Sequence, residues 1–282
     1  MSLPEDFDVG DFVSRVLAED LGSGGDVTSK ATIPPDARFT AEMNARQAIT
    51  VAGLDIAAEF FRQLDPKIEI EQPVTDGDPV SHGTTIMRLV GNAQAMLTAE
   101  RSALNTLQHL SGIATLTSQY VDAIAGTGAI LIDTRKTVPG LRVLEKYAVR
   151  MGGAQNHRMR LDDGVLIKDN HVAVCGGVAE AVRRATAAKT GLQVQVEVDR
   201  IDQIEPALAA GADRLLLDNM DPAMLREAVG LVGGRAPLEA SGGVTLETIR
   251  FLAETGVNFI SVGRITQSAP AVDIGLDYAL SR

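Results

Sequence analysis

Short hydrophobic runs alternate with longer amphipathic segments over the second half of the chain. The runs are rich in Val, Ile and Leu and span residues 129–134, 164–169, 193–199, 213–218, 236–241 and 258–263. Ala- and Leu-rich segments of helical length separate them. Strand, helix and strand in this order predict right-handed βαβ units and a parallel sheet, because parallel strands need a crossover that a helix provides.

The predicted strands are fewer than the eight of a complete barrel. The pattern therefore fits an α/β fold that is either an incomplete, TIM-like parallel β/α barrel or a doubly wound sheet. One regularity favours the barrel, because nearly every run is followed by polar residues or Gly, at 133–136, 168–171, 197–199, 218–219, 239–243 and 263–264. The C-terminal ends of barrel strands meet at one face, so these clusters are predicted to form one site.

The N-terminal part of the chain follows a different pattern. Between 41 and 97, short apolar runs are broken by Pro, Gly and Asp, which indicates short strands with turns and one helix near 55–64. From Thr98, apolar residues recur at helical spacing through Ile124, and Thr98 is the predicted N-cap. This part is predicted to be a separate α/β element.

The composition is that of a globular protein, 45% hydrophobic and 22% charged. The single cysteine, Cys175, excludes an intrachain disulfide and favours a reducing compartment. The N-terminus lacks a basic segment followed by an apolar run, and the chain has no long uncharged apolar stretch. A cytoplasmic protein without a membrane span is therefore expected.

The net charge of −11 argues against nucleic acid or an anionic membrane as the general partner. Positive charge is nonetheless concentrated in residues 135–168, where eight Lys and Arg residues stand against three acids. Arg142, Lys146 and Arg150 are spaced by four and are interpreted as a solvated helix face. That interpretation does not extend to the cations that flank strand-like or Gly-rich segments, which are Arg135, Lys136, Arg158 and Lys168.

Two late loops have the composition of a phosphate site. Ser241, Gly242 and Gly243 precede a helix predicted from Thr245, and Gly263 follows the last strand. Gly permits close backbone approach, and a helix N-terminus supplies free N–H groups, which late barrel strands often use for phosphate. A tight turn alone would give the same Ser-Gly-Gly pattern, so the phosphate prediction depends on the two loops together.

Glu197 and Asp218 each end an apolar strand at a position where packing needs no charge. A buried acid is costly unless it is paired or binds a metal. The two carboxylates are therefore candidates to hold Mg²⁺, directly or through water or substrate, or to accept hydrogen bonds from sugar hydroxyls. The alternative is structural pairing with Lys168.

Basic side chains supply the rest of the candidate site, at Arg135, Lys136, His157, Arg158 and Lys168. Arg binds carboxylates through a planar fork, whereas Lys is a mobile point charge suited to phosphate, so the site is predicted to bind both groups. His171 is a candidate to orient a strand-end loop, with a solvent-facing side chain as the alternative. Cys175 and four His make no zinc pattern, and Cys175 is expected to be a passive small residue.

A series of longer motifs runs along the chain. They are EDLG at 19–22, GDVT at 25–28, TAERSALN at 98–105, HLSGIAT at 109–115, DTRKTVPGLR at 133–142, KYAVRMGG at 146–153, NHR at 156–158, LIKDNH at 166–171 and EASGG at 239–243. Together they strongly resemble the quinolinate phosphoribosyltransferase family, also called nicotinate-nucleotide pyrophosphorylases (carboxylating). The resemblance covers nearly the whole chain, and several motifs in one order are more specific than any single match.

The resemblance implies an α/β sandwich over residues 1–110, joined by the C-terminal tail at about 267–282, and a barrel of fewer than eight strands over 111–266. It also implies an activity, in which quinolinate and phosphoribosyl pyrophosphate, with Mg²⁺, give nicotinate mononucleotide, pyrophosphate and CO₂ in de novo NAD synthesis. A head-to-tail homodimer is implied as well, with assemblies of dimers left open.

Roles for single residues follow from the same resemblance. Arg101 from the neighbouring subunit would complete a quinolinate pocket formed by Thr134, Arg135, His157, Arg158 and Lys168. The catalytic set would be Lys136 and Lys168, which meet phosphates, with Glu197 and Asp218, which hold the ribose hydroxyls and Mg²⁺. The 5′-phosphate would lie against Ser241, Gly242, Gly243, Gly263 and Arg264.

Three alternatives stay open. The first is a paralogue on the same scaffold that acts on another acidic ring, such as the pyrophosphorylase-like protein found with molybdate transport systems; the full Arg, His and Lys set disfavours it. The second is a Schiff-base aldolase or sugar-phosphate isomerase that uses Lys136 or Lys168, which the neighbouring arginines disfavour. The third is a sensor that binds a phosphate ligand without turnover.

Overall fold

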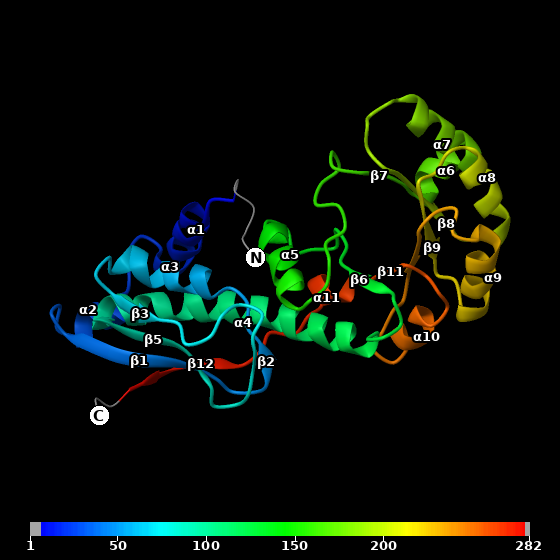
Figure 1. Ribbon diagram of the computed structural model, residues 1–282. Helices are drawn as coiled ribbons and strands as arrows, with labels where there is room; N and C mark the ends of the chain where they lie inside the picture. Colours follow the sequence, from blue (N-terminus) through cyan, green and yellow to red (C-terminus); the bar gives the residue numbers. More distant parts are fainter. Residues whose placement is uncertain (1–6, 280–282) are drawn as a thin grey trace. The chain divides into compact units, whose positions relative to one another are not determined.

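The computed structural model describes residues 7–279, which form two compact units (Figure 1). The first unit takes in the described parts of Met1–Thr117, Val143–Gly153 and Ala269–Arg282, and the second consists of Ser118–Arg142 and Ala154–Ser268. The ends of the predicted sandwich domain, at 1–6 and 280–282, lie outside the described residues.

The first unit contains an antiparallel sheet in the order β12-β1-β5-β3. Period-two burial in β1 places Ala41, Met43 and Ala45 in the core. The strands are β1 (Arg38–Ala45), β3 (Glu69–Glu71), β5 (Thr85–Asn92) and β12 (Ile274–Tyr278), with a separate pair of β2 (Ile49–Thr50) and β4 (Pro79–Val80). The helices are α1 (Val9–Leu21), α2 (Val27–Thr32), α3 (Leu54–Leu64) and most of α4 (Ala93–Ala123) and α5 (Arg142–Met151). The helix predicted near 55–64 is α3.

The long helix α4 begins earlier than the sequence pattern predicted. Asn92 caps it, because its side-chain Oδ1 accepts a hydrogen bond from the backbone N–H of Ala95 at 3.0 Å. Thr98 lies inside the helix, where its hydroxyl donates to the carbonyl of Gln94 at 2.7 Å. The prediction of Thr98 as N-cap is therefore wrong, since a Thr side chain can be satisfied within a helix as well as at its start.

Helix α5 is buried in the first unit, although the predicted domain ranges placed it in the barrel. Lys146 and Glu145 are fully buried, and Glu145 lies 3.0 Å from His109 Nε2. The Tyr147 hydroxyl donates to Asp76 at 2.5 Å, and burial together with this carboxylate raises the pKa of Tyr147. The interpretation of 142, 146 and 150 as a solvated basic face is therefore wrong, because α5 turns its middle charges into a polar core.

The second unit contains six parallel strands in the order β6-β11-β10-β9-β8-β7. They are β6 (Ile130–Ile132), β7 (Val165–Ile167), β8 (Val194–Val198), β9 (Arg214–Asp218), β10 (Leu238–Ser241) and β11 (Phe259–Ser261). Each lies within one of the six predicted runs, so these predictions are confirmed. The crossovers carry α6 (Asp169–Cys175), α7 (Val178–Ala187), a 3₁₀ turn (Ile201–Gln203), α8 (Ile204–Ala209), α9 (Pro222–Val232) and α10 (Ile249–Ala253), and α11 (Arg264–Gln267) follows the last strand. Figure 1 shows α7, α8 and α9 along the outside of the strands.

The strand order distinguishes a barrel from a doubly wound sheet. From β7 to β11 each strand pairs with the next, and β6, the first strand of the unit, pairs with β11, the last. A doubly wound sheet would instead reverse its order beside a central first strand. Between β6 and β7 the sheet is open apart from an isolated bridge of Ile132 to Gln155. The predicted incomplete parallel barrel with an N-terminal α/β element is confirmed, and the sheet of that element is antiparallel.

Two smaller expectations differ in outcome. The helix predicted from Thr245 begins at Ile249, because Thr245 and Thr248 form a hydrogen-bonded turn instead, with the Thr245 N–H donating to the Thr248 hydroxyl at 3.0 Å. Among the helices of residues 7–279, none combines the length and the apolar character that a membrane crossing needs.

Candidate functional site

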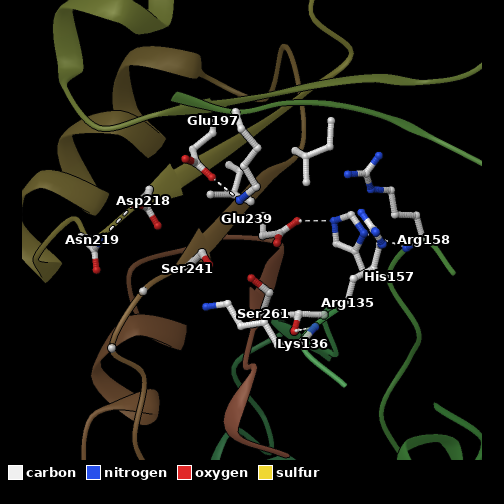
Figure 2. Close-up of a pocket in the computed structure, with 16 residues that line it drawn as sticks. Arg135, Lys136, His157, Arg158, Glu197, Asp218, Asn219, Glu239, Ser241 and Ser261 are labelled. Carbon is white, nitrogen blue, oxygen red and sulfur yellow. Dashed lines mark hydrogen bonds and ion pairs between the residues drawn. The ribbon is translucent and has the colours of Figure 1, made fainter. Parts of the chain in front are cut away.

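A cavity of about 570 Å³ opens among the C-terminal ends of the barrel strands (Figure 2). Eleven of the predicted site residues line it: Thr134, Arg135, Lys136, His157, Arg158, Lys168, Glu197, Asp218, Ser241, Gly242 and Gly243. The cavity is also lined by Leu166, Leu216, Asn219, Glu239 and Ser261. The expectation that separate strand-end clusters form one site is therefore met by the geometry.

The strand pleat explains which side chains enter the cavity. Successive residues point to opposite faces of a strand, so a residue two positions before a strand-end site residue faces the same way. Leu216 precedes Asp218 in this sense, and Glu239 precedes Ser241. The alternate residues, such as Leu215 and Leu217, are fully buried on the other face of the strand. The strands are therefore apolar on the face away from the barrel interior and polar where their C-terminal ends face the cavity.

One wall of the cavity is cationic. Figure 2 shows Arg135, His157 and Arg158 on one side and Glu197 and Asp218 on the other. Arg158 is half-buried, and its Nη1 donates to the carbonyl of Gly164 at 2.8 Å. Burial and, next, the charge of Arg135 lower the pKa of Arg158. Two guanidinium groups thus repel one another here, and an anion with more than one charge would relieve that repulsion.

The opposite wall carries the two strand-end acids. Glu197 forms an ion pair with Lys168, so the alternative of structural pairing with Lys168 describes a contact that exists. The Lys168 side chain remains 44% exposed, which leaves its ammonium group able to meet a ligand. Burial and the charge of Glu197 raise the pKa of Asp218, while Lys168, Asn219 and Lys136 oppose the shift. The acids are therefore close enough to repel, which favours a cation between or beside them.

Glycines shape the floor between these walls. Gly242 has a φ of +99°, and a Cβ at this position would lie 2.1 Å from Asn219 Oδ1. The Ser-Gly-Gly turn therefore requires Gly for both its backbone conformation and the close approach of Asn219. Gly263 and Arg264 do not line the cavity, but a Cβ on Gly263 would lie 2.9 Å from Lys136 Cδ, so Gly263 gives the Lys136 side chain its space.

The comparisons with known proteins give a consistent result. The sequence matches the model of the quinolinate phosphoribosyl transferase N-terminal domain over residues 26–111 and that of the C-terminal domain over 113–277. The chain belongs to the quinolinate phosphoribosyltransferase family. The family that the motifs resemble is thereby confirmed.

Individual relatives are similar over almost their whole length. A nicotinate-nucleotide pyrophosphorylase (carboxylating) of Mycobacterium leprae is 43% identical over 272 residues, which cover 95% of this chain and 96% of the relative. A mitochondrial quinolinate phosphoribosyltransferase (decarboxylating) of Nicotiana glauca is 42% identical, over 96% of this chain and 82% of the relative. The solved nicotinate-nucleotide pyrophosphorylase of Francisella tularensis has a TM-score of 0.93 at 41% identity, over 99% of this chain and 98% of that one.

Two further candidate residues lie outside the cavity lining. Arg101, which the family resemblance suggested, is exposed on α4 in the first unit. His171 is exposed at the start of α6, and its Nδ1 accepts a hydrogen bond from the backbone N–H of Lys168 at 3.0 Å. The predicted contact of His171 with the strand-end loop and the alternative of a solvent-facing side chain thus both describe this residue.

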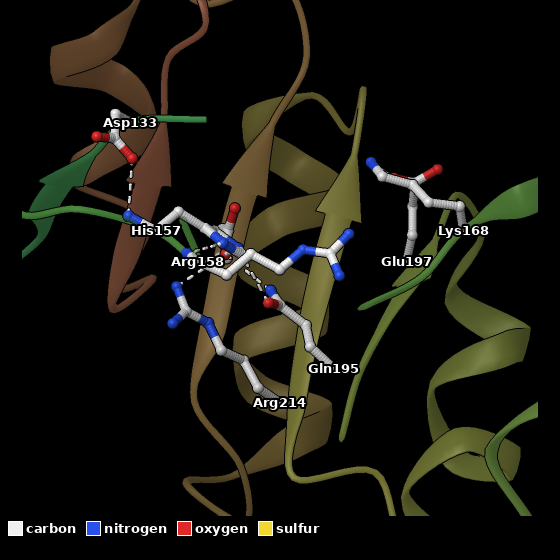
Figure 3. A network of polar contacts seen from close by, with 8 residues as sticks. Asp133, His157, Arg158, Lys168, Gln195, Glu197 and Arg214 are labelled. Carbon is white, nitrogen blue, oxygen red and sulfur yellow. Dashed lines mark hydrogen bonds and ion pairs between the residues drawn. The ribbon is translucent and has the colours of Figure 1, made fainter. Parts of the chain in front are cut away.

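Sequence reasoning missed the polar layer just beneath the cavity. Gln195 and Glu239 are buried and Arg214 is nearly so. Gln195 and Arg214 point toward His157 (Figure 3), and Glu239 contacts all three side chains. A signal existed in the strand 193–199, where Gln and Glu alternate with Val. Side chains two or four residues before a strand-end site residue point to the same face of the strand. Counting back in this way from Glu197, Asp218 and Ser241 would have found Gln195, Arg214 and Glu239.

The acids of the site fit a shared metal ion better than a protein cage. Among the residues that the structure describes, no three His, Cys, Asp or Glu side chains form a metal-binding group. Glu197 and Asp218 are two carboxylates whose proximity already raises the pKa of Asp218. Mg²⁺ is commonly bound through one or two carboxylates together with substrate phosphates and water, and these two residues fit that mode.

Proposed function

We propose that this protein forms nicotinate mononucleotide, pyrophosphate and CO₂ from quinolinate and phosphoribosyl pyrophosphate, with Mg²⁺, in de novo NAD synthesis. The observation that carries the proposal is the paired guanidinium groups of Arg135 and Arg158 in one cavity with Glu197 and Asp218. A dicarboxylate suits the first pair, whereas ribose hydroxyls and a cation suit the second.

Quinolinate binds at the cationic wall. Its two carboxylates meet Arg135 and Arg158, and the exposed ammonium group of Lys168 is available to the same ligand. Arg suits this role because its fork matches the geometry of a carboxylate. Bound quinolinate also offsets the repulsion that lowers the pKa of Arg158 in the free protein.

The phosphoribosyl group binds across the floor. Its 5′-phosphate lies against Ser241, Gly242 and Gly243, where a backbone without Cβ atoms allows close approach. Glu197 and Asp218 accept hydrogen bonds from the ribose hydroxyls, and Lys136 stands at the pyrophosphate. Glu197 and Asp218 would also hold Mg²⁺, which would supply charge neutralisation for the departing pyrophosphate.

The reaction needs no covalent enzyme intermediate. As the bond from C1 of the ribose to pyrophosphate breaks, positive charge develops on the sugar, which the nearby carboxylates stabilise while Lys136 stabilises the leaving anion. The pyridine nitrogen then forms the new bond to C1. The quaternised ring accepts the electron pair released when the adjacent carboxylate leaves as CO₂, and a proton takes its place. Positioning and electrostatics account for the catalysis.

Arg101 and the assembly are part of the same proposal. Arg101 is an exposed cation on α4 within a motif shared with the family, and in a homodimer it would complete the quinolinate pocket of the partner subunit. Assemblies of such dimers are compatible with this arrangement. A cytoplasmic location is likewise proposed, supported by the single free cysteine.

The test is nucleotide formation with matched pyridine acids. With phosphoribosyl pyrophosphate and Mg²⁺, quinolinate labelled in its 2-carboxylate is expected to release one CO₂ per nucleotide, and nicotinate, which lacks that carboxylate, is expected to be a poor substrate. Equal use of both acids would favour a paralogue, and binding without CO₂ release would favour a sensor. Borohydride is expected to trap no Lys adduct with sugar phosphates, because Lys168 is paired with Glu197.

A further inference from the structure

Four largely buried side chains form a network at the edge of the cavity, here called the Glu239 network: Glu239, Gln195, Arg214 and His157. Glu239 and His157 line the cavity (Figure 2), and Gln195 and Arg214 lie beside His157 (Figure 3). Glu239 is fully buried, and its Oε2 accepts from Gln195 Nε2 at 2.7 Å and from Arg214 Nη2 at 2.8 Å. The same oxygen lies 3.5 Å from His157 Nε2. Three adjacent strands, β8, β9 and β10, therefore meet at one carboxylate oxygen.

The hydrogen bonds of this network specify the tautomer of His157. Its Nδ1 accepts the backbone N–H of Arg158 at 2.7 Å, so Nδ1 is the nitrogen without a proton. Its Nε2 lies 3.1 Å from Gln195 Oε1. Because the amide nitrogen of Gln195 donates to Glu239, the amide oxygen faces His157 and can only accept. His157 Nε2 must then carry the proton.

The ionised state of Glu239 fixes the direction of these bonds. Burial opposes ionisation of Glu239, whereas the ion pair with Arg214 and the hydrogen bond accepted from Gln195 favour the carboxylate. A protonated carboxyl would gain a donor, and Gln195 could then turn its amide over. The carboxylate is acceptor-only, and its presence leaves Gln195 with a single orientation.

Stability alone does not account for such a network. Burying charges is costly, and apolar residues of similar volume are often at least as stabilising. Two members of the network, Glu239 and His157, line the cavity, which indicates that the benefit of the network lies in the site.

We propose that Glu239 is a positioning residue for the quinolinate end of the site. Through Gln195 it holds His157 as the Nε2-protonated tautomer, and His157 Nδ1 in turn holds the backbone N–H of Arg158 and so sets where the Arg158 guanidinium lies. His157 contributes shape and orientation, while the positive charge comes from the arginines. The expected effect on quinolinate binding rests on the proposed function, whereas the tautomer of His157 does not.

The experiment measures the tautomer and the kinetics separately. In protein labelled with ¹⁵N at its four histidines, the ring nitrogens of His157 are expected to show a protonated Nε2 and an unprotonated Nδ1 at pH 7.5. In Glu239→Gln and in Gln195→Met the ring loses its fixed acceptor at Nε2, so it is expected to turn away from the Arg158 N–H and this tautomer to be lost or mixed. Gln195→Met leaves the ion pair of Glu239 with Arg214 in place, so it carries the test even where Glu239→Gln does not fold.

The kinetic expectation is selective for one substrate. The KM for quinolinate should rise by up to about 100-fold in either variant, as expected for misplacement of a binding group by about 1 Å, with the KM for phosphoribosyl pyrophosphate unchanged. Glu205→Gln is the control, because Glu205 is half-exposed and pairs with Arg235 away from the cavity. It should change neither the tautomer nor either KM.

Three results would overturn the inference. They are an Nδ1-protonated or doubly protonated His157 in the wild-type protein, an unchanged tautomer in both variants, or a lowered melting temperature with both KM values unchanged. The NMR result stands even if the protein does not turn over quinolinate, so failure of the proposed function and failure of this inference are distinguishable.

Discussion

Replacement of Arg158 by Met tests the electrostatic design of the site most directly. The Met side chain fills a similar volume but removes the guanidinium from the cationic wall. A hydrogen bond to a charged group contributes about 1.5–3 kcal/mol, and each 1.4 kcal/mol corresponds to about tenfold in affinity. We therefore expect the dissociation constant of quinolinate to rise by about 10- to 100-fold.

The same substitution should not destabilise the free protein as loss of an ordinary buried cation would. Burial and the neighbouring charge of Arg135 lower the pKa of Arg158, so its charged form is disfavoured in the folded state and its removal relieves that penalty. The lost hydrogen bond to Gly164 acts in the opposite direction. We expect a melting temperature within a few degrees of the wild type, together with much weaker binding.

Isothermal titration with quinolinate and thermal unfolding without ligand measure these two quantities. Arg235→Met is the matched control, because Arg235 forms an exposed ion pair with Glu205 outside the cavity and should leave quinolinate affinity unchanged. Unchanged quinolinate affinity in Arg158→Met, with the protein folded, would refute the assignment of the cationic wall to the dicarboxylate.

Three further predictions concern the acids, the glycine turn and the subunit interface. Because the pKa of Asp218 is raised, its neutral form persists to higher pH than for an ordinary Asp, so the apparent Mg²⁺ affinity should fall earlier on acidification. Asp218→Asn should remove this pH dependence and lower activity, and it should raise the melting temperature of the free protein by about 2–4 °C. Mg²⁺ titrations and thermal unfolding measure these effects. Gly242→Ala should cost about 1–3 kcal/mol and raise the KM for phosphoribosyl pyrophosphate, because φ is +99° and the new Cβ would meet Asn219; a wild-type denaturation midpoint would contradict this. Arg101→Ala and Lys136→Ala should each be inactive, and mixing them should restore part of the activity through hybrid dimers; no rescue despite confirmed subunit exchange would exclude a shared site.

The sequence determined the barrel because its signal is local and repeated. Each strand is a short β-branched run followed by polar residues, and the order of runs and helical segments specifies parallel strands. The same local logic identified nine of the eleven predicted residues that line the cavity, since strand ends in a barrel converge on one face; the other two, His157 and Arg158, were found from their polar, basic segment. The contact of His171 with Lys168 was within reach of sequence reasoning because the two residues are only three positions apart.

Only the tertiary structure decided what the charges contact. Lys146 has the spacing of a solvated face and yet is fully buried, because the partner surface of α5 lies in the first unit and far away in sequence. The start of α4 was also not decided by sequence. Asn92 and Thr98 can each cap a helix, but in the structure Asn92 accepts the capping hydrogen bond and Thr98 donates to a carbonyl inside the helix.

The Glu239 network shows where sequence reasoning ends for this protein. The chain order places Glu239 in an apolar strand and His157 in a polar segment, and the two-residue period can indicate only that Glu239 faces inward. That Gln195, Arg214 and His157 meet its one oxygen atom is set by the pairing of β8, β9 and β10 and by the position of His157 beside them, which join residues far apart in the chain. Local periodicity thus determined the fold and the residue types at the site, whereas the hydrogen-bond directions that give those residues their states arise only when the strands are packed.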